Sequence, residues 1–426
     1  MIYANAHKFI QSAPPEIEES FTGERLKRLW QWLDLNPKGI KYLRLTGISG
    51  KSICAQLLSA VYENTDSSIG TLLLPLQGDF RDNIRINHRP LSTEELTDYV
   101  QRIYGIVKER ARLSREDEQT DCAPILLSRH ELLLTVALLA FQAHHCKFCI
   151  IESDNTDADP TRLLPPPLLL SVCGPIPHPT TKDAKMIRSY IQHGIQEMIC
   201  DPQNQESYGF LSNLCAKINC RLTMPSRKEV RLRSLKLSGC LFDYQGLPYE
   251  TKLFGSFQVE NTVMVLEMIS ALRRFGFFVS QETVRDKLSH TKLSGKCEIL
   301  SVSPTVISDC ACHTESLAAV ADSLLSFQPL MGERIRLCMP EGKAAQVAFE
   351  KLLRGRGYEI TSVVTAPLEP VTCYLPPQKN YHQLKLIRQT VQRAMNGLEK
   401  NEILFLCGPS SFVARLRQEC INQLGF

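Results

Sequence analysis

The sequence predicts an α/β fold with two domains: a large domain built on a parallel β-sheet, followed by a smaller α/β domain. Three observations support this prediction. The chain has 426 residues, and a single hydrophobic core rarely grows beyond about 250–300 residues. A short apolar strand, KYLRL at 41–45, runs through a glycine turn into an apolar helix at 52–63. Apolar strands and helical patterns then alternate along the chain, which is typical of a parallel sheet covered by helices.

The elements of the first domain are predicted from hydrophobic periodicity and from breaks at glycine and proline. We place the end of this domain near Leu293, so that it comprises residues 1–293. Its expected elements are a helix within 7–34 that ends at NPKG, the strand at 41–45, the helix at 52–63, a buried helix at 131–143, a strand at 147–151, a strand at 168–174, and helices at 259–277 and 281–288.

The second domain, residues 294–426, opens with a β-rich stretch at 297–309 and then alternates again. Helices and strands of similar length follow one another, which predicts a second sheet with helices on its faces. The expected elements are helices at 316–327, 344–353, 383–397 and 411–421, and strands at 334–339, 358–364 and 402–408.

The composition excludes several classes of protein. Hydrophobic residues make up 43% and charged residues 22% of the chain, as in globular proteins and unlike disordered or fibrous ones. The net charge of +4 is too small to indicate a nucleic-acid or membrane partner. The amino terminus lacks a basic stretch followed by an apolar core, so we expect a cytoplasmic protein without an export signal.

The 16 cysteines are scattered through apolar strands and helices, which predicts reduced, mostly buried thiols. Cys146 and Cys149 form a CxxC pair, and Cys310, Cys312 and His313 form a second group. A zinc site is one interpretation of the two groups together. We favour a structural role, because Cys149 falls in an apolar strand, where side chains three residues apart point to opposite faces.

The clearest local motif is TGISGKS at 46–52, between the strand and the helix. Gly47 and Gly50 allow backbone amides to approach phosphate oxygens, Lys51 supplies a positive charge, and Ser52 supplies a hydroxyl. The motif lacks the first glycine of the usual phosphate loop, and a Gly-Lys-Ser triplet also occurs in ordinary surface turns. Its position between strand and helix favours phosphate binding.

Several motifs together resemble the folylpolyglutamate synthase and dihydrofolate synthase family of the Mur ligase superfamily. The glycine turn resembles the family's TGTNGK, and it follows a helix, an NP turn and a strand as in that family. The other matching segments are LLPLQGDFRDNIRIN at 73–87 with PLSTEEL after it, GSFQVEN at 255–261, KLSGKCEIL at 292–300 and SDCACHTES at 308–316. The resemblance covers essentially the whole chain.

The resemblance implies a Mur-ligase-like ATP-binding domain at 1–293 and a Rossmann-like domain at 294–426. It implies an ATP-dependent ligase of one-carbon metabolism, in which ATP phosphorylates the carboxylate of a folate or related acid and the amine of glutamate displaces the phosphate. The implied cofactors are ATP and Mg²⁺, and the protein is expected to be a monomer.

Site residues carry over at the positions that match the family's motifs. Glu152 follows an apolar strand, and ligands gather at the carboxyl ends of parallel strands; a solvated strand end is the alternative. His178 lies between two prolines and is equally consistent with a plain loop residue. The implied nucleotide-binding residues are Gly47, Ser49, Gly50, Lys51, Ser52, Gln258, Asn261, Lys296 and Asp309; the implied catalytic residues are Lys51 and Asp309; and the implied metal ligands are Ser52, Glu152 and His178.

The chain departs from the family's pattern at several positions of the reaction centre. A lysine that the family carbamylates to hold a second magnesium falls on Gln192, and the DGAHN histidine is Cys312. The linker arginine is Lys296, which cannot make the same bidentate contact. Further changes are Ile48, Ser49 and Ile53 in the loop, Leu74 and Leu76 in place of the family's serine and histidine, and ESDNTDAD at 152–159 in place of a glycine-rich stretch. Two alternatives therefore stand beside an active ligase: a weakened or inactive pseudoenzyme that keeps the fold, and a Mur-type ligase for another acid.

Overall fold

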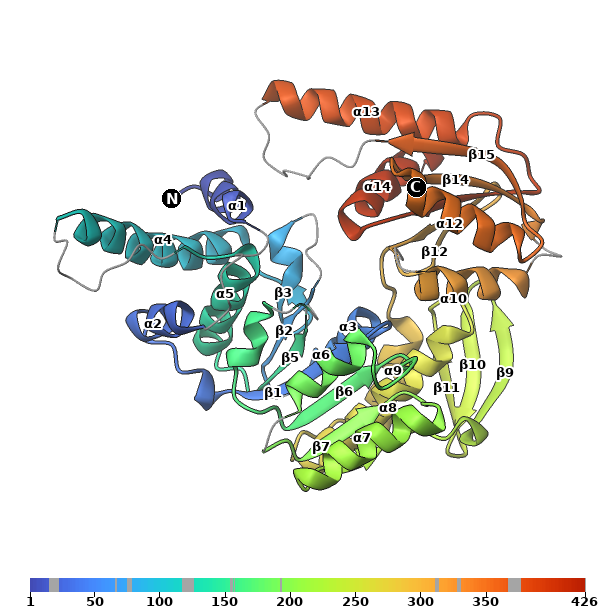
Figure 1. Cartoon of the computed structure of the whole chain (residues 1–426). Coiled ribbons are helices and arrows are strands. Elements are labelled where there is room, and N and C mark those ends of the chain that lie inside the picture. The colour runs from blue at the N-terminus through green and yellow to red at the C-terminus, as the bar shows by residue number, and fades with distance from the viewer. Residues whose placement is uncertain are drawn as a thin grey trace. The chain divides into compact units, whose positions relative to one another are not determined.

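The computed structural model describes residues 1–14, 23–65, 67–74, 79–116, 126–153, 156, 158–191, 194–310, 314–327, 331–366 and 377–425. The chain forms two compact units (Figure 1). Unit 1 comprises Met1–Pro75, Asp79–Ser226 and Met264–Gln281, and unit 2 comprises Arg227–Val263 and Glu282–Phe426. Each unit contains more than one segment of the chain, so a single boundary does not separate them. The domain boundary near Leu293 stays a prediction.

Unit 1 is built on an eight-stranded sheet in the order β4-β3-β2-β5-β1-β6-β7-β8. Strands β2, β5, β1, β6, β7 and β8 run parallel to one another. Strands β3 and β4 extend the sheet beyond β2 and pair in antiparallel fashion. The parallel sheet predicted from the sequence is therefore confirmed. The strands are β1 Lys41–Gly47, β2 Ile69–Leu72, β3 Ile84–Ile86, β4 Arg89–Pro90, β5 Phe148–Glu152, β6 Leu169–Cys173, β7 Glu197–Cys200 and β8 Arg221–Thr223.

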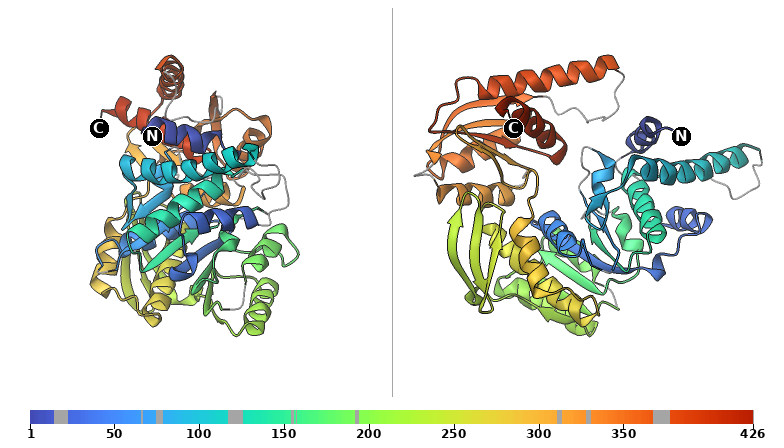
Figure 2. Two further views of the ribbon diagram at one scale, coloured as in Figure 1. Left: turned by 90° about the vertical axis from the view of Figure 1, so that its left-hand side faces the viewer. Right: turned by 180° about the vertical axis from the view of Figure 1, so that it is seen from behind.

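Helices cover both faces of this sheet. Successive strand residues point to opposite faces, so the contacts of neighbouring residues tell the faces apart. Arg44 of β1 packs on Tyr190 of α6, whereas Glu152, which pairs in register with Leu45, bonds to Ser52 of α3. Helices α1, α4 and α5 pack beside one another (Figures 1 and 2). The helices are α1 Tyr3–Ser12, α2 Glu24–Trp32, α3 Lys51–Val61, α4 Thr93–Glu116, α5 Arg129–Ala143, α6 Lys182–Tyr190 and α7 Gln205–Lys217, with short 3-10 turns η1 Pro37–Gly39, η2 Phe80–Asn83 and η3 Pro160–Leu163. A further 3-10 turn, η4 Arg227–Glu229, belongs to unit 2.

Unit 2 contains a three-stranded antiparallel sheet that the sequence analysis missed, formed by β9 Val230–Lys236, β10 Gly239–Tyr244 and β11 Leu247–Thr251. The turn between β10 and β11 gives a usable signal, since Gln245 and Gly246 both have positive φ (49° and 76°), as in a two-residue hairpin loop. Strand β9 carries basic residues at alternate positions and has no apolar run, so the pattern of a buried strand is missing there. Helix α8 Phe257–Arg274 follows and is divided between the units, since its residues from Met264 onward belong to unit 1. Helix α9 Gln281–His290 comes next.

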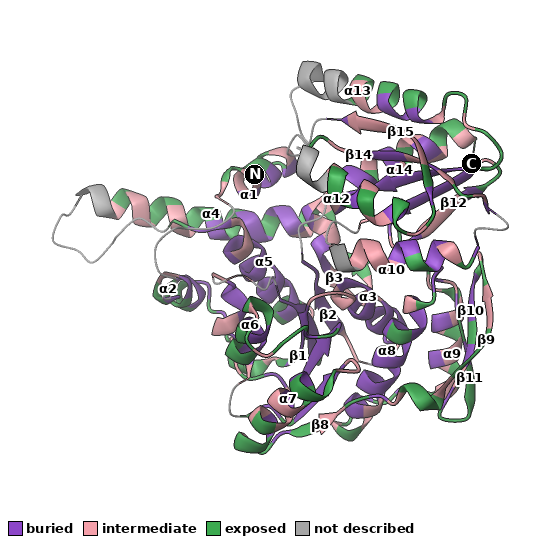
Figure 3. Cartoon of the chain, turned by 45° about the vertical axis from the view of Figure 1, so that its right-hand side comes forward, coloured by how far each residue is buried: buried purple, intermediate pink, exposed green. Residues whose placement is uncertain are grey.

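The second sheet of unit 2 has the order β12-β13-β16-β14-β15, parallel except for the pairing of β12 with β13. One buried cluster joins the sheet to α10 and α12, and another joins its opposite face to α13 and α14. Figure 3 shows β14 as largely buried between these layers. The elements are β12 Glu298–Val302, β13 Thr305–Asp309, α10 Thr314–Leu325, β14 Arg334–Pro340, α12 Lys343–Arg354, β15 Glu359–Ala366, α13 Pro377–Met395, β16 Glu402–Cys407 and α14 Ser410–Leu424.

All thirteen cysteines within the described residues have free thiols, and all of them except Cys310 are buried. Over the same residues, none of the helices combines the length and the apolar character that crossing a membrane requires.

Candidate functional site

The glycine motif forms a tight turn between β1 and α3. Gly47 and Gly50 have φ of 112° and 83°, a region that other residues rarely adopt. A Cβ on Gly47 would lie 2.0 Å from the carbonyl oxygen of Cys173, the same oxygen that accepts a hydrogen bond from the Ile48 amide at 2.9 Å. The turn is therefore pressed against the end of β6, and both glycines are required by the backbone.

Lys51 is the first residue of α3, and its Nζ donates to the carbonyl oxygen of Gly47 at 2.8 Å. The ammonium group thus lies over the turn, at the amino end of a helix, where backbone N–H groups favour anions. The order of strand, glycine turn and helix is the one that the sequence motif predicted. The binding of phosphate by the turn stays a proposal.

Glu152 and Ser52 are brought together at this turn. Glu152 ends β5, next to β1, and its side chain is only 1% exposed. Its Oε2 accepts hydrogen bonds from the hydroxyl of Ser52 at 3.1 Å and from the amide of Leu74 at 3.0 Å. A carboxylate and a hydroxyl are oxygen ligands of the kind that Mg²⁺ prefers. The two residues therefore fit the metal role that the resemblance implies for them.

His178 lies in the loop after β6, where its ring is about half exposed. The Nδ1 atom accepts from the Thr180 amide at 3.2 Å, and Nε2 lies 3.3 Å from Glu206 of α7. These contacts hold the ring within its own loop and against α7, so metal binding would require it to turn. Among the described residues, no group of three or more histidine, cysteine, aspartate or glutamate side chains is arranged to hold a metal ion, and His178 as a ligand stays a prediction.

Asp201 and Gln203, which follow β7, were not predicted as site residues from the sequence. The carboxylate of Asp201 accepts from the Gly174 amide at 2.5 Å, and Gln203 donates to the Gly174 carbonyl at 3.2 Å. A Cβ on Gly174 would lie 2.6 Å from the hydroxyl oxygen of Ser49, so these residues support the glycine turn from the side of β6. The rule that selected Glu152, a carboxylate just after an apolar strand, also selects Asp201.

The four site residues predicted in 255–309 belong to unit 2 and make hydrogen bonds to one another or to the backbone of residues 296 and 297. Asn261 donates to Gln258 Oε1 at 3.0 Å, and Gln258 Nε2 donates to the Lys296 carbonyl at 3.5 Å. The carboxylate of Asp309, which ends β13, accepts from the Cys297 amide at 2.5 Å. The structure therefore brings Gln258, Asn261, Lys296 and Asp309 together around one stretch of backbone. Their contacts with a nucleotide stay a proposal.

Several departures from the family's pattern can be placed, and others cannot. Ile53 is buried in α3, and Leu74 is buried with its amide bonded to Glu152. Leu76, Gln192, Cys312 and His313 lie outside the described residues, as do parts of the stretch at 152–159.

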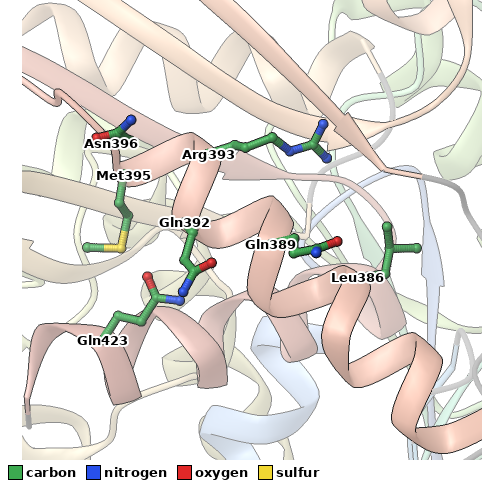
Figure 4. A pocket seen from close by; sticks show the side chains of 7 residues that line it. All are labelled: Leu386, Gln389, Gln392, Arg393, Met395, Asn396 and Gln423. Atoms are coloured by element: carbon green, nitrogen blue, oxygen red, sulfur yellow. The ribbon is translucent and has the colours of Figure 1, made fainter.

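Surface grooves occur away from these residues. One of about 790 Å³ lies between α13 and α14, where Figure 4 shows the amide groups of Gln392 and Gln423 pointing toward one another and the side chain of Arg393 pointing away from them. Another, of about 700 Å³, is lined by α1 and α4. None of the predicted site residues lines either groove.

Comparison with known proteins assigns the fold to one class, that of the folylpolyglutamate synthases. No protein-family model matches the sequence, and neither does any curated protein. Solved structures match over essentially the full length of both chains. A folylpolyglutamate synthase complex with AMPPCP and folate has a TM-score of 0.77 at 17% identity, with 100% of each chain covered.

Two enzymes from named organisms agree with this assignment. The folylpolyglutamate synthase of Thermotoga maritima has a TM-score of 0.74 at 18% identity and covers 98% of this chain and 96% of its own. That of Mycobacterium tuberculosis, complexed with ADP and AMPPCP, has a TM-score of 0.70 at 14% identity, with 97% of each chain covered. The resemblance inferred from the motifs is thus confirmed at the level of the fold.

Proposed function

We propose that this chain is an ATP-dependent ligase of the folylpolyglutamate synthase type, which adds glutamate to the carboxylate of a folate or a related acid. The single observation that carries the proposal is the contact of Ser52 with Glu152 beside the glycine turn, in a fold shared with synthases solved with AMPPCP and folate. A ligase of this kind transfers the γ-phosphate of ATP to the acid, and the glutamate amine then displaces phosphate from the acyl phosphate.

The chain's own residues have defined parts in this proposal. Backbone amides of the glycine turn and the ammonium group of Lys51 bind the phosphates and offset their charge. Ser52 and Glu152 would hold a magnesium ion, which neutralises charge on the transferring phosphoryl group when bound. Asp309 and Gln258 keep the turn around Lys296 in place for contact with the nucleotide.

Phosphate release tests the proposal directly. We expect the full chain to cleave ATP to ADP and phosphate only when magnesium, a folate and glutamate are all present, and to yield a folate longer by one glutamate by mass spectrometry. Cleavage of ATP that ignores the acid would contradict a ligase, because acyl phosphate formation requires the carboxylate.

A second candidate is a pseudoenzyme that keeps the fold and nucleotide binding. The replacement of the family's carbamylated lysine by Gln192 favours it, since an amide cannot be carbamylated. The first candidate implies weak ligase activity, and Gln192→Lys should then increase folate-dependent phosphate release. If neither the parent nor this variant lengthens a folate while both bind ATP, the pseudoenzyme or a different acid substrate replaces the first candidate.

A further inference from the structure

The turn that carries Lys296 is held by two carboxylates. It spans residues 293–297, between α9 and β12. The Gly295 amide donates to Glu298 Oε2 at 2.9 Å, and the Cys297 amide donates to Asp309 Oδ2 at 2.5 Å. Between them, the Lys296 amide reaches only the Leu293 carbonyl, at 3.4 Å. The backbone on each side of Lys296 is thus fixed by a charged side chain, which makes shorter and stronger bonds than a neutral acceptor does.

The conformation of this turn is not one that the chain adopts readily. Gly295 has φ of 65°, and Cys297, which is not a glycine and is fully buried, has φ of 53°. A left-handed backbone at a residue with a side chain costs on the order of 1 kcal/mol and persists only where surrounding contacts hold it. The two carboxylates supply those contacts.

The 293–297 turn also packs closely against Cys310 and against α14. A Cβ on Gly295 would lie 2.8 Å from Cys310 Sγ and 3.4 Å from a methyl carbon of Val413. The Cys310 amide donates to the Gly295 carbonyl at 2.8 Å. The turn is therefore seated on the end of β13 and on the first turn of α14, and a shift of either element moves it.

Arg417 of α14 holds the carboxylate of Glu298 in place. Its Nε donates to Glu298 Oε2 at 2.6 Å and its Nη2 to Oε1 at 2.7 Å. The hydrogen bonds to Glu298 raise the pKa of Arg417. The two side chains are 22% and 23% exposed. Without Arg417, Glu298 keeps the Gly295 amide at 2.9 Å and a long bond from the Ser308 hydroxyl at 3.4 Å, so its carboxylate could turn to water and release the Gly295 amide.

From this arrangement we propose that Arg417 is a positioning residue for nucleotide binding: by clamping Glu298 it fixes the 293–297 turn and thereby the reach of Lys296. The proposal rests on the proposed function, in which Lys296 contacts the nucleotide. Arg417 itself touches neither nucleotide nor acid, so its effect on binding passes through Lys296.

A double-mutant cycle on the full chain tests this, with the dissociation constant of magnesium AMPPCP measured by calorimetry. We expect Arg417→Gln to weaken binding by roughly fivefold, and Arg417→Lys, which keeps the charge but not the bidentate geometry, by less. In a Lys296→Ala background, Arg417→Gln should change the constant by less than about twofold, because the residue through which it acts is already gone.

Arg336→Gln is the matched control. Arg336 makes a similar bidentate pair with Glu402 in the same unit, at 3.2 and 3.0 Å, between β14 and β16. The Arg336–Glu402 pair is more buried, and Arg336 also donates to the carbonyls of Ala394, Asn396 and Gly397, so the control variant should lower the unfolding midpoint at least as much as Arg417→Gln does and leave nucleotide affinity unchanged. Should Arg417→Gln fail to fold, Arg417→Lys and Glu298→Gln report on the same pair.

The outcomes separate this inference from the proposed function. A parent that binds no nucleotide overturns both. A parent that binds nucleotide and loses it with Lys51→Ala, while Arg417→Gln behaves like Arg336→Gln, overturns the inference alone. An equal effect of Arg417→Gln with and without Lys296 also overturns it, since the guanidinium would then act by another route.

Discussion

The hydroxyl of Ser52 donates to the carboxylate of Glu152 at 3.1 Å, although the two residues are a hundred positions apart in the chain. The contact exists because β1 and β5 are neighbours in the sheet and both end at the same edge. One strand leads into the glycine turn and α3, and the other delivers a carboxylate to the first turn of that helix. The parallel sheet thus assembles the two proposed metal ligands.

Replacing Glu152 with glutamine should remove the magnesium dependence of nucleotide binding. The amide of glutamine still accepts from Ser52 and Leu74, so the local structure is retained, but the negative charge that attracts the cation is lost. We expect magnesium to tighten AMPPCP binding by roughly tenfold in the parent and by less than about twofold in Glu152→Gln. Titrations with magnesium and with EDTA measure both constants.

The EDTA titration is the internal control, since the parent and the variant should agree there. A variant that responds to magnesium as strongly as the parent would show that the ion is bound elsewhere, and Glu152 would then be only a support for Leu74 and Ser52.

Lys51→Ala should weaken nucleotide binding by more than about tenfold, because the lost ammonium group neutralises phosphate charge at the glycine turn. Lys185→Ala, on the exposed surface of α6, is the matched control and should bind as the parent does. Calorimetric titration with AMPPCP decides the matter. Equal constants for the two variants would refute phosphate binding by the turn.

Gly47→Ala should destabilise unit 1 by about 3 kcal/mol or more, because its Cβ would collide with the Cys173 carbonyl and its φ of 112° is strained for alanine. Gly105→Ala provides the contrast. Gly105 lies in α4 with no atom within 4 Å of an added Cβ, so alanine there should stabilise by about 0.5–1 kcal/mol. Urea unfolding curves of both variants measure the difference, and similar midpoints would contradict the tight contact with β6.

The sequence predicted the elements that have a strong period and clear breaks. The strand at 41–45, the helix at 52–63 and the apolar helix at 131–143 appear as β1, α3 and α5. Apolar runs of that length are buried in the core of the protein, so the sequence alone marks them. Strands β9 to β11 were not predicted. Strand β9 has no buried residue and carries Arg231 and Arg233, whereas β10 offered a signal that was overlooked, because Cys240, Phe242 and Tyr244 alternate as buried residues.

The site divides in the same way. Glu152 could be selected from a local rule, a carboxylate at the end of a parallel strand. The partnership of Glu298 with Arg417 could not, since it spans 119 positions and depends on how α14 packs on the sheet. Asp309 was selected by resemblance. Its bond to the Cys297 amide could not be predicted, because it depends on the left-handed conformation of Cys297, which directs that amide toward the carboxylate.

His7 should make stability fall as the pH is lowered. Burial lowers its pKa from 6.5, and its ring is stacked on Phe80 at 4.5 Å. The folded pKa is therefore below the unfolded one, so the unfolded state binds the proton more readily. The contribution of the neutral ring is complete above about pH 6.5 and is lost as the pH falls through the lowered folded value.

The free energy of unfolding at about pH 7.5 and pH 5.5 tests this in the parent and in His7→Leu. The leucine variant should lose less stability between the two values, because it has no proton to take up. Parallel losses in the two proteins would assign the pH dependence to other groups, such as the neighbouring Asp79, whose charge acts on His7.

Lys296→Arg should tighten nucleotide binding by roughly threefold to tenfold, and Lys296→Ala should weaken it. Hydrogen bonds on both sides fix the backbone of Lys296, from Gly295 to Glu298 and from Cys297 to Asp309. The side chain of an arginine at position 296 would therefore extend from the same backbone position. Its planar group can make two parallel bonds to a phosphate, where an ammonium group acts as a point charge. Lys292→Arg, at an exposed position four residues earlier, controls for a general effect of arginine. If Lys292→Arg and Lys296→Arg bind AMPPCP with the same constant as the parent, Lys296 does not contact the nucleotide, and the resemblance of 292–300 to the family's linker concerns the fold alone.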